Sequence, residues 1–273
     1  MFNKQLTPEE LSVQARQIRR LIIQMLARSG SGHPGGSLSA ADLITALYFN
    51  VLRFNPTDLQ WTDRDRFHMS KGHACPLWYA VLAQVGCFEK EKLLTLRKFG
   101  SMLQGHPVRC TPGVESASGS LGQGLSIALG MSLAAKVDKK DYRVYCLLGD
   151  GEVQEGSVWE AAMACAHFSC SNICAILDFN GCQIDGRCQD IMGIEPLAAK
   201  WQAFGWQVIE INGHDMRQIL AAYDQAKTIK NKPTIIIART VKGKGVSFME
   251  NVVDFHGRAP TQEEAVKALK ELE

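Results

Sequence analysis

The feature that most constrains the fold is the segment 143–186, which has the pattern of a β-α-β unit. A continuous apolar run at 144–148 is typical of a buried parallel strand, and it ends at Gly149-Asp150-Gly151. A second apolar run at 173–177 leads into Asp178-Phe179-Asn180. Between the two runs, apolar residues at helical spacing predict a helix: Val158, Ala162, Cys165 and Phe168. The segment therefore predicts two parallel strands joined by a helix.

Two oxygen-bearing side chains are expected at one edge of this unit. Parallel strands bring their carboxyl ends to the same edge, so Asp150 and Asn180 should lie close together, where open α/β folds place their ligands. Carboxylate and amide oxygens suit Mg²⁺ or Ca²⁺, and a magnesium site keeps room for phosphates. Gly151 has no Cβ, so a diphosphate can approach the backbone there. The motif predicts a metal-bridged diphosphate.

Strand and helix patterns alternate along most of the remaining chain. Apolar runs predict strands at 66–69, 207–211 and 234–238. Periodicity and capping residues predict helices at 8–29, about 40–51, after Gly124, 196–204, 216–228 and after Thr261. This alternation favours a doubly wound, mostly parallel sheet with helices on both faces. We expect residues 1–273 to form one domain.

Four histidines share a setting that favours ligand binding over core packing. Each lies beside glycine, and two also adjoin proline, in segments where a strand or loop meets a helix: His33, His73, His106 and His256. Imidazole accepts and returns protons near neutral pH, which suits acid/base chemistry. His68, His167 and His214 lack this setting and are interpreted as ordinary residues.

The segment Ser118-Gly119-Ser120-Leu121-Gly122-Gln123-Gly124 also precedes a predicted helix. Its glycines could belong to a phosphate loop. However, the lysine of a P-loop is absent, and the dinucleotide pattern requires a strand directly before the glycines, where this chain has Thr111-Pro112-Gly113. A nucleotide-binding role is therefore disfavoured.

The Gly-Asp-Gly motif followed about thirty residues later by Asn180 resembles the fingerprint of thiamine diphosphate enzymes. The flanking 152–156 and 159–161, with the Ser31-Gly32-His33-Pro34-Gly35 loop and Gly105-His106-Pro107, resemble transketolases in particular. The resemblance implies that Mg²⁺ is held by three groups: Asp150, Asn180 and the main-chain carbonyl of Cys182. It implies that four residues line the diphosphate site: Gly151, His73, Lys242 and His256. It also implies that the backbone of Gly119, Ser120 and Leu121 runs alongside the thiamine ring.

The same resemblance implies catalytic roles. His33 and His256 would contact the reacting carbonyl and hydroxyl, and His106 the hydroxyl of the two-carbon fragment. Glu155 would approach, across a subunit interface, the glutamate that activates the coenzyme; its position at a predicted helix start also suits an ordinary acid stabilised by the helix dipole.

In transketolases the activating glutamate and the basic residues for the sugar phosphate belong to a second domain. This sequence stops after Glu273, so the resemblance covers only the diphosphate-binding half. It implies the N-terminal subunit of a split transketolase, with a C-terminal partner subunit, a heterotetramer, and ketol transfer from a ketose phosphate to an aldose phosphate. The sugars stay open, from pentose phosphates to a branched pentulose phosphate.

Two other classes of function stay open. One is a subunit of another thiamine diphosphate enzyme, either a 2-oxo acid dehydrogenase α subunit or a deoxyxylulose-phosphate synthase; the histidine motifs favour ketose substrates instead. The other is a binding module without catalysis. The presence of the four histidines beside glycine and of both side-chain metal ligands disfavours it.

Composition excludes several classes of protein. With 46% hydrophobic and 21% charged residues and a net charge of +2, neither disorder nor nucleic-acid binding is indicated. No apolar stretch approaches the roughly 20 residues of a membrane span, and the N-terminus lacks the apolar core of a signal peptide. No cysteine pair has C-x₂-C spacing. We expect a cytoplasmic protein.

Overall fold

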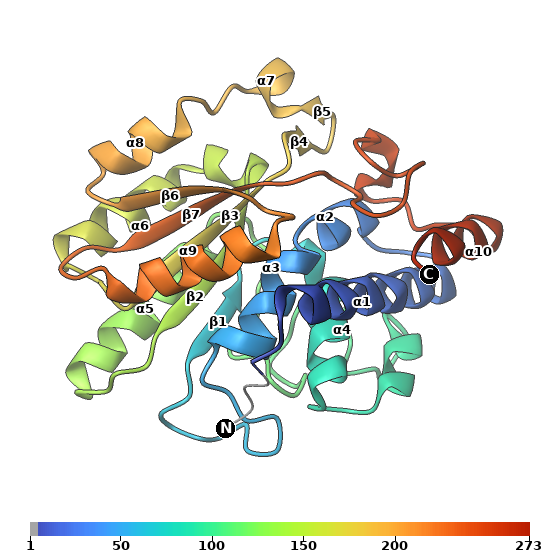
Figure 1. Cartoon of the computed structure of the whole chain (residues 1–273), viewed down its shortest axis with the longest axis horizontal. Helices are drawn as coiled ribbons and strands as arrows, with labels where there is room; N and C mark the ends of the chain where they lie inside the picture. Colours follow the sequence, from blue (N-terminus) through green and yellow to red (C-terminus); the bar gives the residue numbers. More distant parts are fainter. Residues whose placement is uncertain (1–4) are drawn as a thin grey trace.

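The computed structural model describes residues 5–273 and confirms the α/β architecture (Figure 1). Its main sheet has five strands in the order β1-β2-β3-β7-β6, and every neighbouring pair is parallel. In this order the strands are β1 (Arg66–Met69), β2 (Val144–Gly149), β3 (Ile173–Phe179), β7 (Thr234–Arg239) and β6 (Gln207–Asn212). The predicted strands are thus all present, within one or two residues at their ends.

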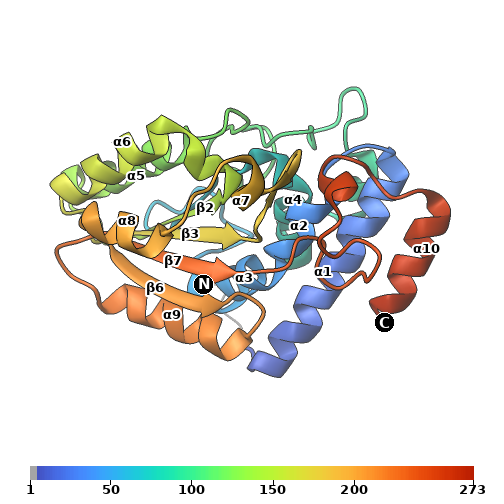
Figure 2. The same ribbon diagram turned by 90° about the horizontal axis from the view of Figure 1, so that it is seen from above.

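Helices cover both faces of the sheet, as predicted (Figure 2). Alternate residues of β2 show why: Tyr145 and Leu147 join one hydrophobic cluster, whereas Cys146 and Leu148 join the other. The first cluster includes residues of α1 (Pro8–Ser29), α3 (Ala41–Ala46), α4 (Cys75–Val85), α9 (Met216–Thr228) and α10 (Gln262–Glu271). The second includes residues of α5 (Gly124–Val137), α6 (Gly156–His167) and α8 (Leu197–Ala203).

Capping residues explain the boundaries of the two terminal helices. Thr7 and Glu10 form a capping box at the start of α1, and Thr261 and Glu264 form another at the start of α10. Helix α1 ends at Gly30, which adopts the left-handed conformation with φ 65°. Both helix starts were predicted correctly from the sequence.

The helix expected at about 40–51 is present, because α3 continues directly into a π-helical turn, η1 (Leu47–Val51). Ser39 and Asp42, which its sequence offers as capping residues, have other partners: Ser39 Oγ donates to Asp178 Oδ2 at 2.5 Å, and Asp42 pairs with Arg19. A short helix that was not predicted, α2 (Pro34–Ser39), precedes it. Part of the loop predicted around His33 is therefore helix α2.

Several short elements were not predicted. These are the hairpin β4 (Cys182–Gln183) and β5 (Gly186–Arg187), α7 (Cys188–Ile191), and the 3₁₀ turns η2 (Gly72–Ala74), η3 (Lys90–Thr95), η4 (Gly151–Gln154) and η5 (Val253–His256). Elements of two to six residues are too short to show a periodic pattern. The hairpin and η4 nevertheless matter, because they lie at the carboxyl edge of the sheet.

The carboxyl ends of β1, β2, β3 and β7 lead into loops on one side of the molecule, where α2 also lies (Figure 1). The fold therefore gathers segments that are far apart in sequence. Within residues 5–273, the helices are all too short or too polar to cross a membrane.

Candidate functional site

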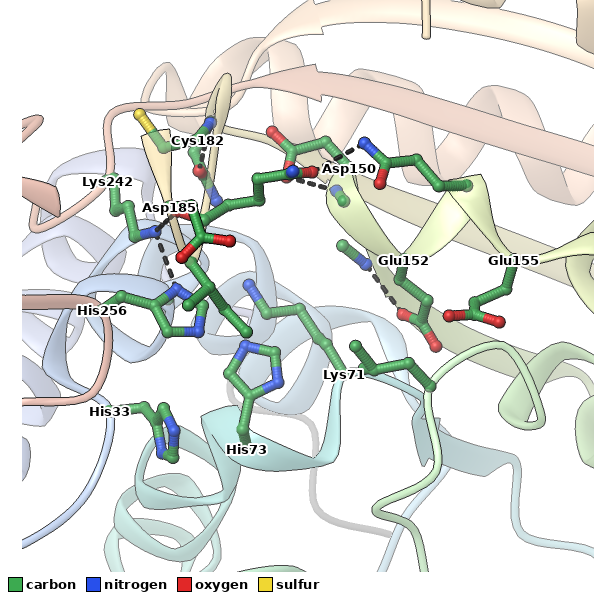
Figure 3. A pocket seen from close by; sticks show the side chains of 18 of the residues that line it. His33, Lys71, His73, Asp150, Glu152, Glu155, Cys182, Asp185, Lys242 and His256 are labelled. Atoms are coloured by element: carbon green, nitrogen blue, oxygen red, sulfur yellow. Dashed lines mark hydrogen bonds between the residues drawn. The ribbon is translucent and has the colours of Figure 1, made fainter. Parts of the chain in front are cut away.

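A cavity of about 390 Å³ opens at this carboxyl edge (Figure 3). Its lining includes the following predicted site residues: His33, His73, His106, Gly119, Leu121, Asp150, Gly151, Glu155, Asn180, Cys182, Lys242 and His256. Ser120 is exposed and lies in a neighbouring depression, beside His68 and Gln123. The structure thus brings together in one place all predicted site residues except Ser120.

Asp150 and Asn180 meet because β2 and β3 are parallel neighbours. Asp150 is buried at the end of β2, where its two carboxylate oxygens accept from the backbone N–H groups of Gly151 (2.8 Å) and Gly181 (2.5 Å). The adjacent Asn180 uses Oδ1 to accept from the Cys182 N–H at 3.2 Å. Burial and the nearby Asp178 carboxylate raise the pKa of Asp150 to about 6, although Lys71 opposes them.

These donors fit a hard divalent cation. Among residues 5–273, no group of three or more His, Cys, Asp and Glu side chains is arranged to hold a metal. The predicted set needs only one such side chain, because its other donors are an amide and a main-chain carbonyl. A cation beside Asp150 would also offset a carboxylate that is buried close to another carboxylate.

The floor of the cavity is a buried ion pair that sequence reasoning missed. Lys71 Nζ lies 2.5 Å from Asp178 Oδ2, and their side chains are 2% and 0% exposed. Burial raises the pKa of Asp178, but the charge of Lys71 together with the hydrogen bonds from Lys71, Ser39 and Thr240 lowers it overall. The same carboxylate accepts hydrogen bonds from Ser39, Thr240 and Asn180 Nδ2. A signal was present, because Asp178 interrupts the end of an apolar strand.

Three of the predicted histidines form a triangle over this floor (Figure 3). The ring centroids of His33, His73 and His256 lie 5.2 to 5.6 Å apart. Lys242 is buried and its Nζ donates to His256 Nδ1 at 2.9 Å. Burial, and then the charge of Lys242, lower the pKa of His256 to about 3. Burial also lowers the pKa of Lys242 and, well below its usual range, that of His73.

An arginine that was not predicted lies near the segments that carry His33 and His106. Arg97 Nη1 donates to Ser31 Oγ at 2.9 Å, and a Cβ added to Gly105 would meet its guanidinium at 2.9 Å. Burial, and then the charge of Arg97, lower the pKa of His33 to about 4. The same two causes lower the pKa of His106, which is exposed. Both imidazoles are therefore neutral near pH 7.

Two glutamates follow Asp150 and differ in environment. Glu152 is buried and accepts from the N–H groups of Gly122 (2.9 Å) and Gly149 (3.0 Å), and from Ser70 Oγ. Burial raises its pKa despite these hydrogen bonds. Glu155 is exposed and its side chain does not cap α6. Glu152 therefore holds the loop before α5 against β2, a structural role that sequence reasoning missed.

Glycines leave the cavity open to an anionic group. A Cβ on Gly36 would lie 3.3 Å from Lys71 Nζ, and a Cβ on Gly151 would lie 3.1 Å from the Gln183 side chain. Two buried lysines and bare backbone thus line one end of the cavity. This chemistry fits a diphosphate.

The chain is similar to known proteins over almost its whole length. Residues 11–272 match the family described as "Transketolase, thiamine diphosphate binding domain". One of the subunits of the apulose-4-phosphate transketolase from Phocaeicola vulgatus is 42% identical over 97% of this chain and 94% of its own length. The 6-deoxy-6-sulfo-D-fructose transketolase subunit SqwG of a Clostridium species is 43% identical over 97% and 96%, respectively.

The fold is also similar to solved structures. The crystal structure of transketolase from Campylobacter jejuni has a TM-score of 0.92 and 35% identity, and the match covers 98% of this chain but only 43% of that one. The chain thus spans nearly the full length of the subunits that it resembles, and less than half of this longer transketolase.

Proposed function

The chain belongs to the family of transketolase thiamine diphosphate-binding domains, and from that premise we propose that it is the N-terminal subunit of a two-chain transketolase. The enzyme would transfer a two-carbon ketol unit from a ketose phosphate to an aldose phosphate, using thiamine diphosphate and Mg²⁺. The observation that carries the proposal is the single cavity that gathers the Asp150/Asn180 pair, two lysines and four histidines.

The metal and the diphosphate would occupy the end of the cavity nearest the sheet. Asp150, Asn180 and the Cys182 carbonyl would hold Mg²⁺, with Ca²⁺ as a possible substitute. Lys242, His73 and His256 would face the diphosphate, and bare backbone at Gly151 would allow its close approach. The backbone of Gly119 and Leu121 would run alongside the thiamine ring. When bound, the coenzyme supplies a carbon nucleophile that takes up the two-carbon unit.

The histidines would handle protons around the substrate. His33 and His256 have pKa values of about 4 and 3, so each is a neutral hydrogen-bonding group at the reacting carbonyl and hydroxyl. In His33 the buried Nδ1 has no hydrogen-bond partner among residues 5–273, which leaves it available to a ligand. His106 would contact the hydroxyl of the transferred fragment, and Glu155 would approach the activating glutamate of the partner.

A C-terminal subunit would complete the active site. Two similar proteins that match this chain over nearly their full length are named as transketolase subunits, which supports a two-chain enzyme. We propose a heterotetramer in the cytoplasm, with residues 1–273 acting as one diphosphate-binding domain. Because both hydrophobic clusters pack on the same sheet, the chain has the core that such a domain needs.

The test is to assay ketol transfer with thiamine diphosphate, Mg²⁺ and sugar phosphates, using this chain alone and with a candidate partner subunit. Activity only with the partner is the expected result, and full activity of the chain alone would contradict the two-chain proposal. Donors should include pentulose, branched and sulfonated ketoses, because the named substrates of the similar subunits are of these kinds. Turnover of 2-oxo acids instead would favour a different thiamine diphosphate enzyme.

A further inference from the structure

His214, which was interpreted from the sequence as an ordinary residue, connects α3 to the segment that follows β7. Its Nε2 accepts a hydrogen bond from the backbone N–H of Val241 at 2.9 Å, and its Nδ1 lies 2.7 Å from Asp42 Oδ2. Val241 immediately precedes Lys242, whose ammonium lies in the cavity beside His256. His214 thus contacts the backbone that carries a buried lysine of the site.

The protonation state of His214 follows from its partners. A backbone N–H can only donate, so Nε2 must be the unprotonated nitrogen that accepts from Val241. The proton is therefore on Nδ1, where it is donated to Asp42. If both ring nitrogens carried protons, the Nε2–H group would face the N–H group of Val241, and this hydrogen bond could not form.

Asp42 is fixed from its other side by an ion pair. Both carboxylate oxygens accept from Arg19, at 2.9 and 2.7 Å, and the two side chains are 8% and 9% exposed. Although burial raises it, the attraction of Arg19 and the hydrogen bond to His214 bring the pKa of Asp42 to about 2. Arg19 also donates to the Leu38 carbonyl in α2, the helix that follows His33. The ion pair therefore ties α1, α2 and α3 to the His214 ring.

The loop that carries His214 is itself held against the end of β7. Gly213 N–H donates to the Arg239 carbonyl at 2.8 Å, and a Cβ on Gly213 would meet Thr240 Cγ2 at 2.5 Å. A larger residue would push this loop away from the β7 end. The imidazole is thus presented to Val241 from a fixed backbone.

We propose that His214 is a positioning residue, which together with the Arg19–Asp42 pair fixes the Val241–Lys242 backbone and so places the Lys242 ammonium for binding of a diphosphate. This inference rests on the proposed function for the identity of the ligand. The effect is indirect, since His214 does not line the cavity.

The first test compares three variants in the complex with the partner subunit, using thiamine diphosphate and Mg²⁺ as the probe. His214→Phe keeps a ring but loses both hydrogen bonds, whereas His214→Gln keeps an amide that can accept from Val241 and donate to Asp42. We expect His214→Phe to weaken coenzyme affinity about 10- to 100-fold, the range typical of groups that orient ligand-binding residues. His214→Gln should recover most of that loss.

The control is His167→Gln, because His167 is exposed at the end of α6 and away from the cavity. It should bind coenzyme like the wild type. Calorimetry gives the affinities, and the rate at saturating coenzyme should fall less than the affinity does. Wild-type affinity in His214→Phe, or no recovery in His214→Gln, would overturn the proposal. If the wild type itself binds no coenzyme, the proposed function fails instead.

A second test uses the isolated wild-type chain and needs no variant to fold. Nitrogen NMR of the His214 ring near pH 7.5 should show a protonated Nδ1 and an unprotonated Nε2. Hydrogen exchange of the Val241 amide should be slow, and it should become faster in His214→Phe if that variant folds. A proton on Nε2 in the wild type would overturn the proposal.

Discussion

The floor and the mouth of the cavity are built in opposite ways. At the floor, Lys71 and Asp178 are buried and their charges pair within the chain. At the mouth, the side chains of His106 and Glu155 are exposed. Neither side chain forms a hydrogen bond or an ion pair with another residue in the range 5–273. Ile184, which also lines the mouth, is 64% exposed. The floor is therefore completed by this chain, whereas the mouth presents groups for a substrate or a partner. Substitutions at the two ends of the cavity test this contrast.

The largest effect is expected at the floor. In Asp178→Asn the Lys71 ammonium would stay buried without its counter-charge, so the free energy of unfolding should fall by about 3–5 kcal/mol. Urea denaturation measures it. The matched control is Asp63→Asn, which breaks the Lys140–Asp63 pair, whose side chains are 39% and 44% exposed; about 1 kcal/mol or less is expected there. Equal losses in the two variants would remove the contrast between floor and surface.

The second prediction concerns ligand binding at the floor compared with the mouth. Asp150→Ala removes a proposed metal ligand, so affinity for thiamine diphosphate with Mg²⁺ should fall by about 100-fold or more, as expected when the metal is no longer held. Asp185→Ala removes another carboxylate that lines the cavity, but one that is exposed near the tip of the β4–β5 hairpin. We expect little change there. Calorimetry of both variants decides, and unchanged affinity in Asp150→Ala would mean that the metal assignment is wrong.

The residues that line the cavity were easier to predict from the sequence than the residues that support them. Asp150, Asn180 and the four histidines are recognisable because a motif or a glycine-rich setting marks each of them. Lys71, Glu152 and His214 act through partners that are 107, 82 or 172 residues away in the sequence. No local pattern encodes such pairings, since they exist only once the sheet order brings the strand ends together.

The strands and most helices were predictable for a physical reason as well. A parallel strand buried on both faces is a continuous apolar run, and capping residues mark the ends of long helices. The helix expected at 40–51 is present as α3 and η1, but Ser39 and Asp42, which look like its capping residues, are bonded to Asp178 and Arg19 instead. Tertiary contacts therefore took over side chains that the local sequence marks as caps.

The third prediction is that acid destabilises the chain through its neutral histidines. Burial lowers the folded-state pKa of His68, which lies outside the cavity, to about 4. In the cavity, burial and then the charge of Arg97 lower the pKa of His33 to about 4 as well. Unfolded histidine has a pKa of about 6.5, so the unfolded chain binds protons first. The stability that these neutral histidines contribute is fully present above about pH 6.5 and is lost as the pH drops toward 4, by roughly 1–3 kcal/mol per histidine.

Urea unfolding at pH 7 and pH 5 measures this loss. His68→Gln should reduce the difference between the two pH values, whereas His167→Gln, at an exposed site, should not. Asp150, whose pKa is raised, acts in the opposite direction, so the comparison with His68→Gln decides. If His68→Gln and the wild type change stability equally between the two pH values, the neutral state assigned to His68 is wrong.

The smallest effect is expected at the mouth, where the charge of Arg97 is largely in water. Arg97→Gln removes that charge, so the pKa values of His33 and His106 should both rise toward the ordinary value of histidine, and only slightly because solvent screens an exposed charge. NMR titration of the histidine ring protons measures both values. Arg97→Lys keeps the charge and should leave them near wild type, as should Lys98→Gln at the next exposed position. If the two pKa values rise equally in Arg97→Lys, the guanidinium acts through its hydrogen bond to Ser31 and not through its charge. The mouth would then depend on contacts within the chain, as the floor does.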